Sequence, residues 1–156
     1  MASSPPDVVH IRSNIYEIGR AFYSQGSRRE LPALTSERMA QLLVGKNRQP
    51  SNEIVAAFDD WANITSFGAF PEGYDAHDLF YWEIRMGSWM SSVLLESDIA
   101  HDTYTSINSR RILDLFLGVA REERISGMIA RHLISSSWPE LFNYPINGKM
   151  VTDPKG

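Results

Sequence analysis

Apolar positions recur at three- and four-residue intervals along most of the chain, which is typical of amphipathic helices that bury one face. A first helix is predicted from residue 13 or 14 to about residue 23. The same spacing predicts further helices at residues 36–45, 51–65, 76–96, 108–118 and 121–133, with a short helical turn at 138–142. Residues 97–107 carry alternating polar positions and are predicted to be extended or irregular. The predicted fold class is therefore mainly α.

Turn-forming residues separate these helices, and no linker is long enough to divide the chain. Gly68, Pro71 and Gly73 predict a loop at residues 66–74, and no internal repeat is visible. A chain of 156 residues with 43% hydrophobic composition is large enough for one core. The sequence predicts a single compact helical domain of about six helices at residues 1–143, around a central buried helix at 76–96, and a loop or flexible tail at 144–156.

The helix predicted at residues 76–96 is apolar around most of its circumference and carries one row of polar side chains. Asp78, Arg85, Ser92 and Glu96 are separated by seven, seven and four residues. At about 3.6 residues per turn, these spacings place all four side chains along one face. Buried charge is costly unless it is paired, so two interpretations stay open. Either Arg85 is neutralised by Asp78 or by an acid of a neighbouring helix, or the row lines a cleft that binds a substrate.

Composition narrows the expected partners and location of the protein. The net charge of -4 comes from 19 acidic and 15 basic residues mixed along the chain, so no basic patch for nucleic acid is expected. No apolar run approaches the roughly 20 residues that span a bilayer, and the first residues lack the features of a signal peptide. The lack of cysteine excludes disulfides and thiolate metal sites. We expect a cytoplasmic protein with no nucleic-acid or membrane partner.

Short motifs follow one another between residues 78 and 134. They are Arg85-Met86, Ser92-Val93-Leu94-Leu95-Glu96, Ser106-Ile107-Asn108-Ser109, Arg110-Arg111-Ile112-Leu113-Asp114-Leu115 and Gly118-Val119-Ala120-Arg121-Glu122-Glu123-Arg124. In this order they resemble the C-terminal half of the asparagine-synthetase-like family, which has an N-type ATP-pyrophosphatase domain. In that family, a helix with Arg and Met leads to a Ser, a Glu, a short extended link and a second helix.

The chain departs from that pattern in three places. The spacing from Arg85 to Glu96 is longer than usual, Asp98 stands where a basic residue is expected, and Ser106-Ile107 replaces the usual Pro-Phe. These departures point away from asparagine as the product and toward a divergent ligase of the group.

The resemblance implies activation of a carboxylate as its acyl-adenylate, release of pyrophosphate, and attack by an amine or ammonia. This chemistry uses ATP and magnesium, but the family's Ser-Gly-Gly-x-Asp-Ser phosphate loop is absent from these 156 residues. The resemblance therefore implies a part or subunit of an amide ligase. Its expected partners are a protein that carries the loop, or further copies of the chain, together with a small carboxylate and an amine. ATP and magnesium would be bound only through such a partner.

The resemblance also assigns roles to five residues of this chain. Glu96 is the catalytic candidate to orient the amine or accept its proton, and Lys149 is the candidate to stabilise the leaving pyrophosphate. Arg85, Ser92 and Asp78 are the candidates for substrate binding, with Arg85 holding a carboxylate.

Two alternative functions stay open. His77-Asp78, with His10 upstream and His101-Asp102 downstream, fits the metal ligands of HD-type phosphohydrolases, although capping of the helix is the simpler role for His77 and Asp78. The other alternative is a non-enzymatic helical module that binds a protein through exposed aromatic side chains. The candidates for such a patch are Trp61, Phe67, Phe70, Trp138, Phe142 and Tyr144.

Overall fold

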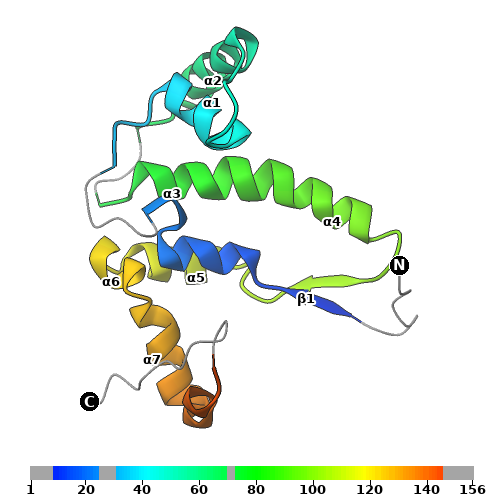
Figure 1. Ribbon diagram of the computed structural model, residues 1–156, viewed down its shortest axis with the longest axis vertical. Coiled ribbons are helices and arrows are strands. Elements are labelled where there is room, and N and C mark those ends of the chain that lie inside the picture. Colours follow the sequence, from blue (N-terminus) through cyan, green and yellow to red (C-terminus); the bar gives the residue numbers. More distant parts are fainter. Residues whose placement is uncertain (1–8, 25–30, 70–72, 146–156) are drawn as a thin grey trace.

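A long central helix crosses the middle of the molecule (Figure 1). The computed structural model describes residues 9–24, 31–69 and 73–145. The central helix consists of three consecutive segments, which are α3 (Ala76–Phe80), the π-helical segment η3 (Tyr81–Met90) and α4 (Ser91–Ser97). Asp75 caps its start, because the carboxylate accepts a hydrogen bond from the His77 amide at 2.8 Å. The helix predicted at residues 76–96 is therefore present.

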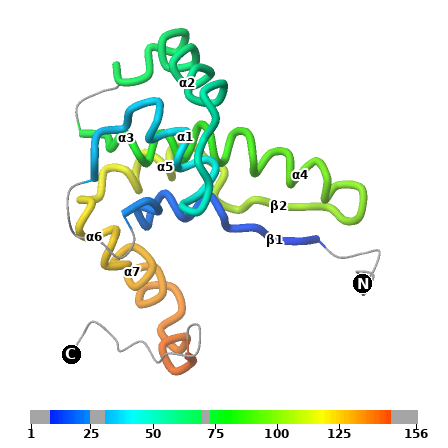
Figure 2. The backbone as a smooth tube through the Cα atoms, turned by 45° about the horizontal axis from the view of Figure 1, so that its top comes forward, coloured from blue at the N-terminus to red at the C-terminus, as the bar shows by residue number. Residues whose placement is uncertain are grey.

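The other helices lie on two sides of the central helix (Figures 1 and 2). On one side α1 (Ser36–Val44) and α2 (Asn52–Thr65) form a hairpin. On the other side lie the 3-10 helices η1 (Asn14–Arg20) and η2 (Phe22–Ser24), with α5 (Arg110–Leu117), α6 (Arg121–Ile125), α7 (Met128–Ser137) and η4 (Pro139–Asn143). No helix in the described ranges is long and apolar enough to cross a membrane. The predicted mainly α fold around one central helix is confirmed.

Two of the predicted helices are interrupted by residues with positive φ. The first is divided at Ala21, which has a φ of 48°, so that it forms the two 3-10 helices η1 and η2. The helix predicted from residue 121 is divided at Gly127, which has a φ of 77°, and becomes α6 and α7. Glycine adopts this conformation readily because it has no Cβ atom.

Two short strands join the N-terminal segment to the link that follows the central helix. β1 (His10–Arg12) and β2 (Thr103–Thr105) pair in parallel, with His10 opposite Thr103. β2 lies within the stretch that the sequence predicts to be extended or irregular. β1 has only three residues and shows no periodic pattern of its own, so the sequence gives no sign of it.

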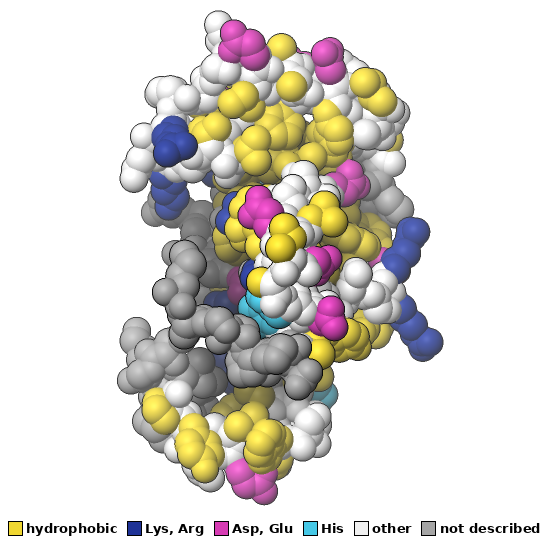
Figure 3. Space-filling view, turned by 90° about the vertical axis from the view of Figure 1, so that its right-hand side faces the viewer, with side chains coloured by type: hydrophobic (Ala, Val, Ile, Leu, Met, Phe, Trp, Pro, Cys, Tyr) yellow, Lys and Arg dark blue, Asp and Glu magenta, His cyan; other side chains and the backbone are white. Residues whose placement is uncertain are grey.

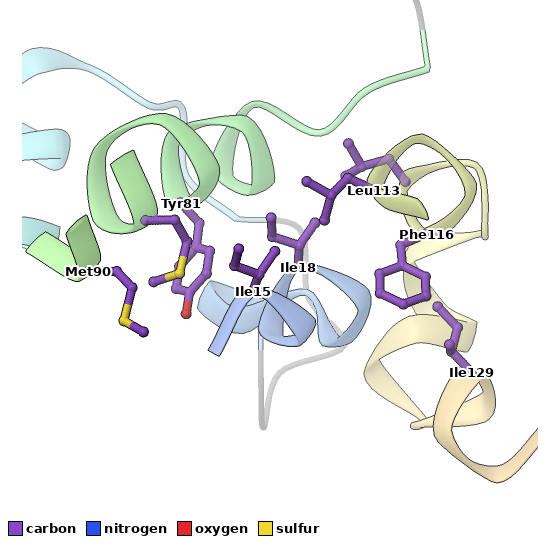
Figure 4. Close-up of a cluster of buried hydrophobic side chains, with 9 residues drawn as sticks. Ile15, Ile18, Tyr81, Met90, Leu113, Phe116 and Ile129 are labelled. Carbon is purple, nitrogen blue, oxygen red and sulfur yellow. The ribbon is translucent and has the colours of Figure 1, made fainter. Parts of the chain in front are cut away.

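The hydrophobic core has two parts, one on each side of the central helix. In the larger part, side chains of the central helix meet those of η1, α5 and α7 (Figure 4). Its buried members are Ile15, Ile18, Tyr81, Met86, Met90, Leu113, Phe116, Leu117 and Ile129. The smaller part lies under the α1–α2 hairpin and contains Met39, Ala40, Phe58 and Phe80. The central helix thus joins both parts.

Serine side chains stabilise the widened turns of the π-helical segment. A π-helix forms i→i+5 hydrogen bonds and leaves neighbouring carbonyl groups in altered positions. Ser91 Oγ donates to the carbonyls of Gly87 and Ser88, at 2.7 and 2.8 Å. Ser92 Oγ donates to the Ser88 carbonyl at 3.0 Å, and Ser88 Oγ donates to the Ile84 carbonyl. These bonds supply donors to carbonyls at the end of η3.

Burial of the central helix stops at Met90, before the predicted end of the buried stretch at residue 96. α3 and η3 contain buried side chains, whereas α4 contains none. Leu95 is 70% exposed, and Ile99 in the following turn is 91% exposed. The prediction of a helix buried over its whole length was therefore wrong for α4, because the helices that cover α3 and η3 do not cover α4.

Candidate functional site

A buried ion pair joins the start of the central helix to α6. The Nη1 atom of Arg124 lies 2.6 Å from Oδ2 of Asp78, and both residues are only 3% exposed. The same guanidinium donates to the carbonyls of Ile18 and Val119, each at 3.0 Å. A charge-assisted bond supported by further hydrogen bonds is what a buried guanidinium requires. Asp78 and Arg124 therefore connect the central helix, η1 and α6.

The buried position of Asp78 also changes its acidity. Burial raises the pKa of its carboxyl group to about 6, although the charge and hydrogen bond of Arg124 act in the opposite direction. Nearby Asp75 behaves differently: burial raises its pKa, but hydrogen bonds from His77 outweigh that effect and lower it overall. Arg121 is 3.8 Å from the Asp75 carboxylate and donates to Ser24 Oγ at 3.1 Å. The start of the central helix is thus a polar centre inside the fold.

Arg85 lies in η3, the next segment of the central helix, among aromatic rings. Its Cζ atom is 4.8 Å from the centroid of the Trp89 ring and 5.4 Å from that of the Phe22 ring. These are distances of cation–π contacts. In the part of the chain that the structure describes, no carboxylate forms an ion pair with Arg85. The arginine is therefore held by the two rings and by the Tyr81 hydroxyl, with which it also forms a hydrogen bond.

Tyr81 completes the polar edge of this aromatic group. Its hydroxyl donates to the Asn14 carbonyl at 3.4 Å. Burial, together with the nearby charge of Glu17, raises the pKa of Tyr81 to about 12, although the charge and hydrogen bond of Arg85 act in the opposite direction. The phenol is consequently neutral near pH 7 and can act as a hydrogen-bond donor or acceptor.

The structure places Ser92 and Glu96 further along the central helix, in α4. Ser92 and Glu96 lie on exposed α4, and the Ser92 hydroxyl is bonded to the Ser88 carbonyl. Lys149 lies outside the described residues. Eleven residues separate Arg85 from Glu96, which at about 1.5 Å per residue is up to roughly 16 Å along the axis. Arg85 and Glu96 therefore cannot contact the same small carboxylate.

The predicted row of four polar side chains is divided into three environments. Asp78 is buried against Arg124, Arg85 is half-buried among aromatic rings, and Ser92 and Glu96 are exposed. The partner of Asp78 is Arg124, not Arg85 as the ion-pair interpretation allowed. The wider turns of η3 change the angle between successive side chains, so spacing at 3.6 residues per turn does not hold across it.

An apolar groove of about 450 Å³ lies between the α1–α2 hairpin and η3. A band of hydrophobic side chains follows this junction on the face shown in Figure 3. The groove is lined by Leu43, Glu53, Ile54, Ala57, Phe58, Trp61, Ile84 and Ser88. Because the lining contains one acidic side chain and one hydroxyl among apolar side chains, the groove suits an apolar group better than a charged substrate.

Two contributors to the site were not identified from the sequence. Arg124 is 46 residues from Asp78 in the sequence. The only pattern that indicates its burial is its position four residues before the apolar Met128 on the predicted helix. Phe22 packs against the larger core, as a residue on the apolar face of the first predicted helix should, and it also contacts Arg85. Periodicity shows which residues share a face, but it does not show which element faces them.

The histidine–aspartate pair does not form a metal centre with other described residues. Asp78 is occupied by Arg124, and the His77 ring packs against Tyr23 with ring centroids 6.5 Å apart. No group of three histidine or carboxylate side chains within residues 9–24, 31–69 and 73–145 is arranged to hold a metal ion. Asp75 and His77 instead form the helix cap.

Comparisons of the chain with protein-family models, curated proteins and solved structures gave no match.

Proposed function

We propose that this chain is the helical C-terminal part, or a subunit, of an asparagine-synthetase-like ligase that activates a carboxylate with ATP. A partner supplies the phosphate-binding loop and, through it, ATP and magnesium. The helical chain supplies an anchor for the carboxylate and a surface that meets the partner. This proposal rests on the resemblance between residues 78 and 134 together with the geometry around Arg85.

The arrangement of elements supports the proposal. The resemblance implies a helix with Arg and Met, a short extended link and a second helix. The central helix carries Arg85 and Met86 in η3, β2 forms an extended segment after it, and α5 follows. Glu96 lies near the end of α4, just before the link.

The observation that carries the proposal is the environment of Arg85. A guanidinium that lies over the Trp89 and Phe22 rings and hydrogen-bonds to the Tyr81 hydroxyl is held in a defined orientation, and none of the ion pairs in the described ranges includes it. Such an arginine can bind a carboxylate through two parallel hydrogen bonds, which lysine cannot do in the same way. Arg85 is therefore the proposed carboxylate anchor.

The exposed part of the central helix supports the need for a partner. Leu95 and Ile99 are separated by four residues and are 70% and 91% exposed, and Trp89 is 44% exposed. Ser92 and Glu96 are exposed on the same helix. A protein surface that covers these apolar side chains would bring Glu96 to the junction of the two chains. Because Arg85 and Glu96 are too far apart to contact one small carboxylate, Glu96 would act on the amine at the carboxyl group that the partner activates, while Arg85 would hold a second carboxylate that does not react.

The test combines the chain with a protein of the same source that carries the Ser-Gly-Gly-x-Asp-Ser loop. Formation of AMP and pyrophosphate is measured with a panel of carboxylates and ammonia. Turnover should require both proteins. Arg85→Lys should raise KM for the carboxylate roughly 10- to 100-fold, because a charge-assisted bidentate contact is worth about 1.5–3 kcal/mol. Arg111→Lys, on the exposed side of α5, is the matched control and should leave KM unchanged.

Glu96 is tested in the same assay. Glu96→Gln should abolish AMP formation without changing the circular dichroism spectrum, whereas Glu83→Gln, also exposed on the central helix, should not. Unchanged turnover in Glu96→Gln would remove Glu96 from the mechanism. Equal turnover with and without the helical chain would overturn the ligase proposal as a whole.

A non-enzymatic interaction module is the second candidate function. The observation that favours it is the number of large apolar side chains at the surface, among them Ile64 and Trp138. Of the six aromatic residues proposed for a patch, Trp138 and Tyr144 are exposed, Phe142 is buried, Trp61 and Phe67 pack against the smaller core, and Phe70 lies outside the described residues. A partner that binds the chain tightly, with neither protein consuming ATP, would support this function over the ligase.

A further inference from the structure

Two histidine side chains meet beside the strand pair, away from the aromatic group around Arg85. Nδ1 of His10 lies 3.1 Å from Nε2 of His101. The centroids of the two rings are 5.1 Å apart, and their planes make an angle of 52°. The residues are 91 positions apart in the sequence. Their meeting is therefore a product of the tertiary fold.

The backbone holds both histidines in place. His10 is the first residue of β1 and pairs with Thr103, and its amide donates to the Asp102 carbonyl at 2.8 Å. The His101 amide donates to the Ser97 carbonyl at 3.1 Å at the end of the central helix. Each imidazole is thus carried by a segment whose backbone is hydrogen-bonded, and the two nitrogens face each other before any ligand binds.

We propose that His10 and His101 bind a divalent transition-metal ion of the zinc or copper class through these two nitrogens. Histidine nitrogens bind zinc at about 2.0–2.1 Å, and two such nitrogens 3.1 Å apart subtend roughly 100° at a shared ion. That angle is near the value of about 109° in a tetrahedral site. Neutral imidazole is a preferred ligand for zinc and copper and a poor one for magnesium.

The protons balance without a co-reactant. In the metal-free pair, one of the two facing nitrogens donates a proton to the other. Metal binding needs both lone pairs, so this proton moves to the remaining nitrogen of its own ring and each imidazole stays neutral. No third histidine or carboxylate in the described ranges joins the pair as a ligand. Water completes the coordination, which is possible because His10 is exposed and His101 is partly exposed.

A bound ion would tie β1 to the link that follows the central helix. Since an ion that binds only the folded chain stabilises it by mass action, the melting temperature should rise with metal concentration. The proposal is independent of the ligase function, because the metal would be held by His10 and His101 and not by Arg85 or Glu96.

The test is calorimetric titration of the full chain with zinc chloride, copper chloride and magnesium chloride. Zinc and copper should bind one-to-one in the micromolar range, and magnesium should not bind. His10→Ala and His101→Ala should each weaken zinc binding at least tenfold, whereas His132→Ala, at an exposed position of α7, should not. Metal-free circular dichroism verifies that each variant is folded.

A second measurement keeps the test decisive if a variant fails to fold. In wild-type chain, the nitrogen NMR signals of the His10 and His101 imidazoles should shift on addition of zinc, while those of His132 stay in place. The proposal is overturned if zinc does not bind, or if binding is equal in wild type, His10→Ala and His101→Ala. In that case the two rings share a hydrogen bond only.

Discussion

Replacing Arg124 with methionine tests how strongly the buried ion pair stabilises the fold. The Arg124 guanidinium donates to Asp78 at 2.6 Å and to the carbonyls of Ile18 and Val119 at 3.0 Å each. Methionine keeps much of the apolar length of the side chain but removes every one of these donors. Asp78, which is 3% exposed in the wild-type chain, then loses the guanidinium that neutralises it, and two carbonyl groups lose a donor.

The expected loss is large for a single substitution. Breaking a buried pair by removal of one partner costs about 3–5 kcal/mol, against a total stability of about 5–15 kcal/mol for a domain. For a chain of this size, that corresponds to a fall in melting temperature of roughly 6–20 °C. The free energy of unfolding is measured by urea titration, followed by tryptophan fluorescence and circular dichroism. Arg111→Met, on the exposed side of α5, is the control and should change stability by less than about 0.5 kcal/mol.

A double substitution separates the ion pair from simple packing. Asp78→Leu combined with Arg124→Met leaves no buried charge, and replacement of a buried pair by apolar side chains is often neutral or stabilising. The double variant should therefore recover much of the stability that Arg124→Met loses. The reasoning is refuted if Arg124→Met unfolds like the Arg111→Met control, or if the losses of the two single variants simply add.

Three further predictions concern the same fold. Burial raises the pKa of Asp78 from 3.8 to about 6, so the folded chain binds more protons than the unfolded chain between these pH values. The free energy of unfolding should therefore fall by up to about 3 kcal/mol as pH rises from about 4 to about 6, and level off above. Urea titrations of wild type and Asp78→Asn measure this, and a difference in stability between the two proteins that does not change with pH contradicts it. Gly19→Ala should cost about 1–3 kcal/mol, because its Cβ would lie 3.0 Å from the buried Phe116 ring, and calorimetry with Gly118→Ala as the milder control measures this. Gly87→Ala should be neutral or stabilise by up to about 1 kcal/mol, because the nearest atom to its Cβ is 3.8 Å away; a loss of more than 1 kcal/mol in the same assay argues against it.

The sequence predicts most helices correctly because apolar spacing reports directly on the buried face of each one. The end of α1 at Gly45 and the cap of the central helix at Asp75 follow from local chemistry, and both are present. The positive φ at Ala21 could not be predicted from the sequence, because alanine rarely adopts that conformation. The parallel pairing of β1 with β2 joins residues about 90 positions apart, and three-residue strands carry too little pattern to predict it.

In the candidate site, the sequence identifies polar residues of the central helix correctly but does not predict which residues surround each of them. Asp78 is buried and Arg85 is half-buried, and η3 lies between Asp78 and Ser92 and changes the phase of the row. Ser91 and Ser92 donate hydrogen bonds to carbonyls at the end of η3. Asp78 is turned toward Arg124, where it stabilises the core, while Arg85 is turned toward aromatic rings and the Tyr81 hydroxyl. The ion pair of Asp78 with Arg124 holds elements of the core together, so the proposed carboxylate site is at Arg85, whose guanidinium meets rings and a neutral hydroxyl.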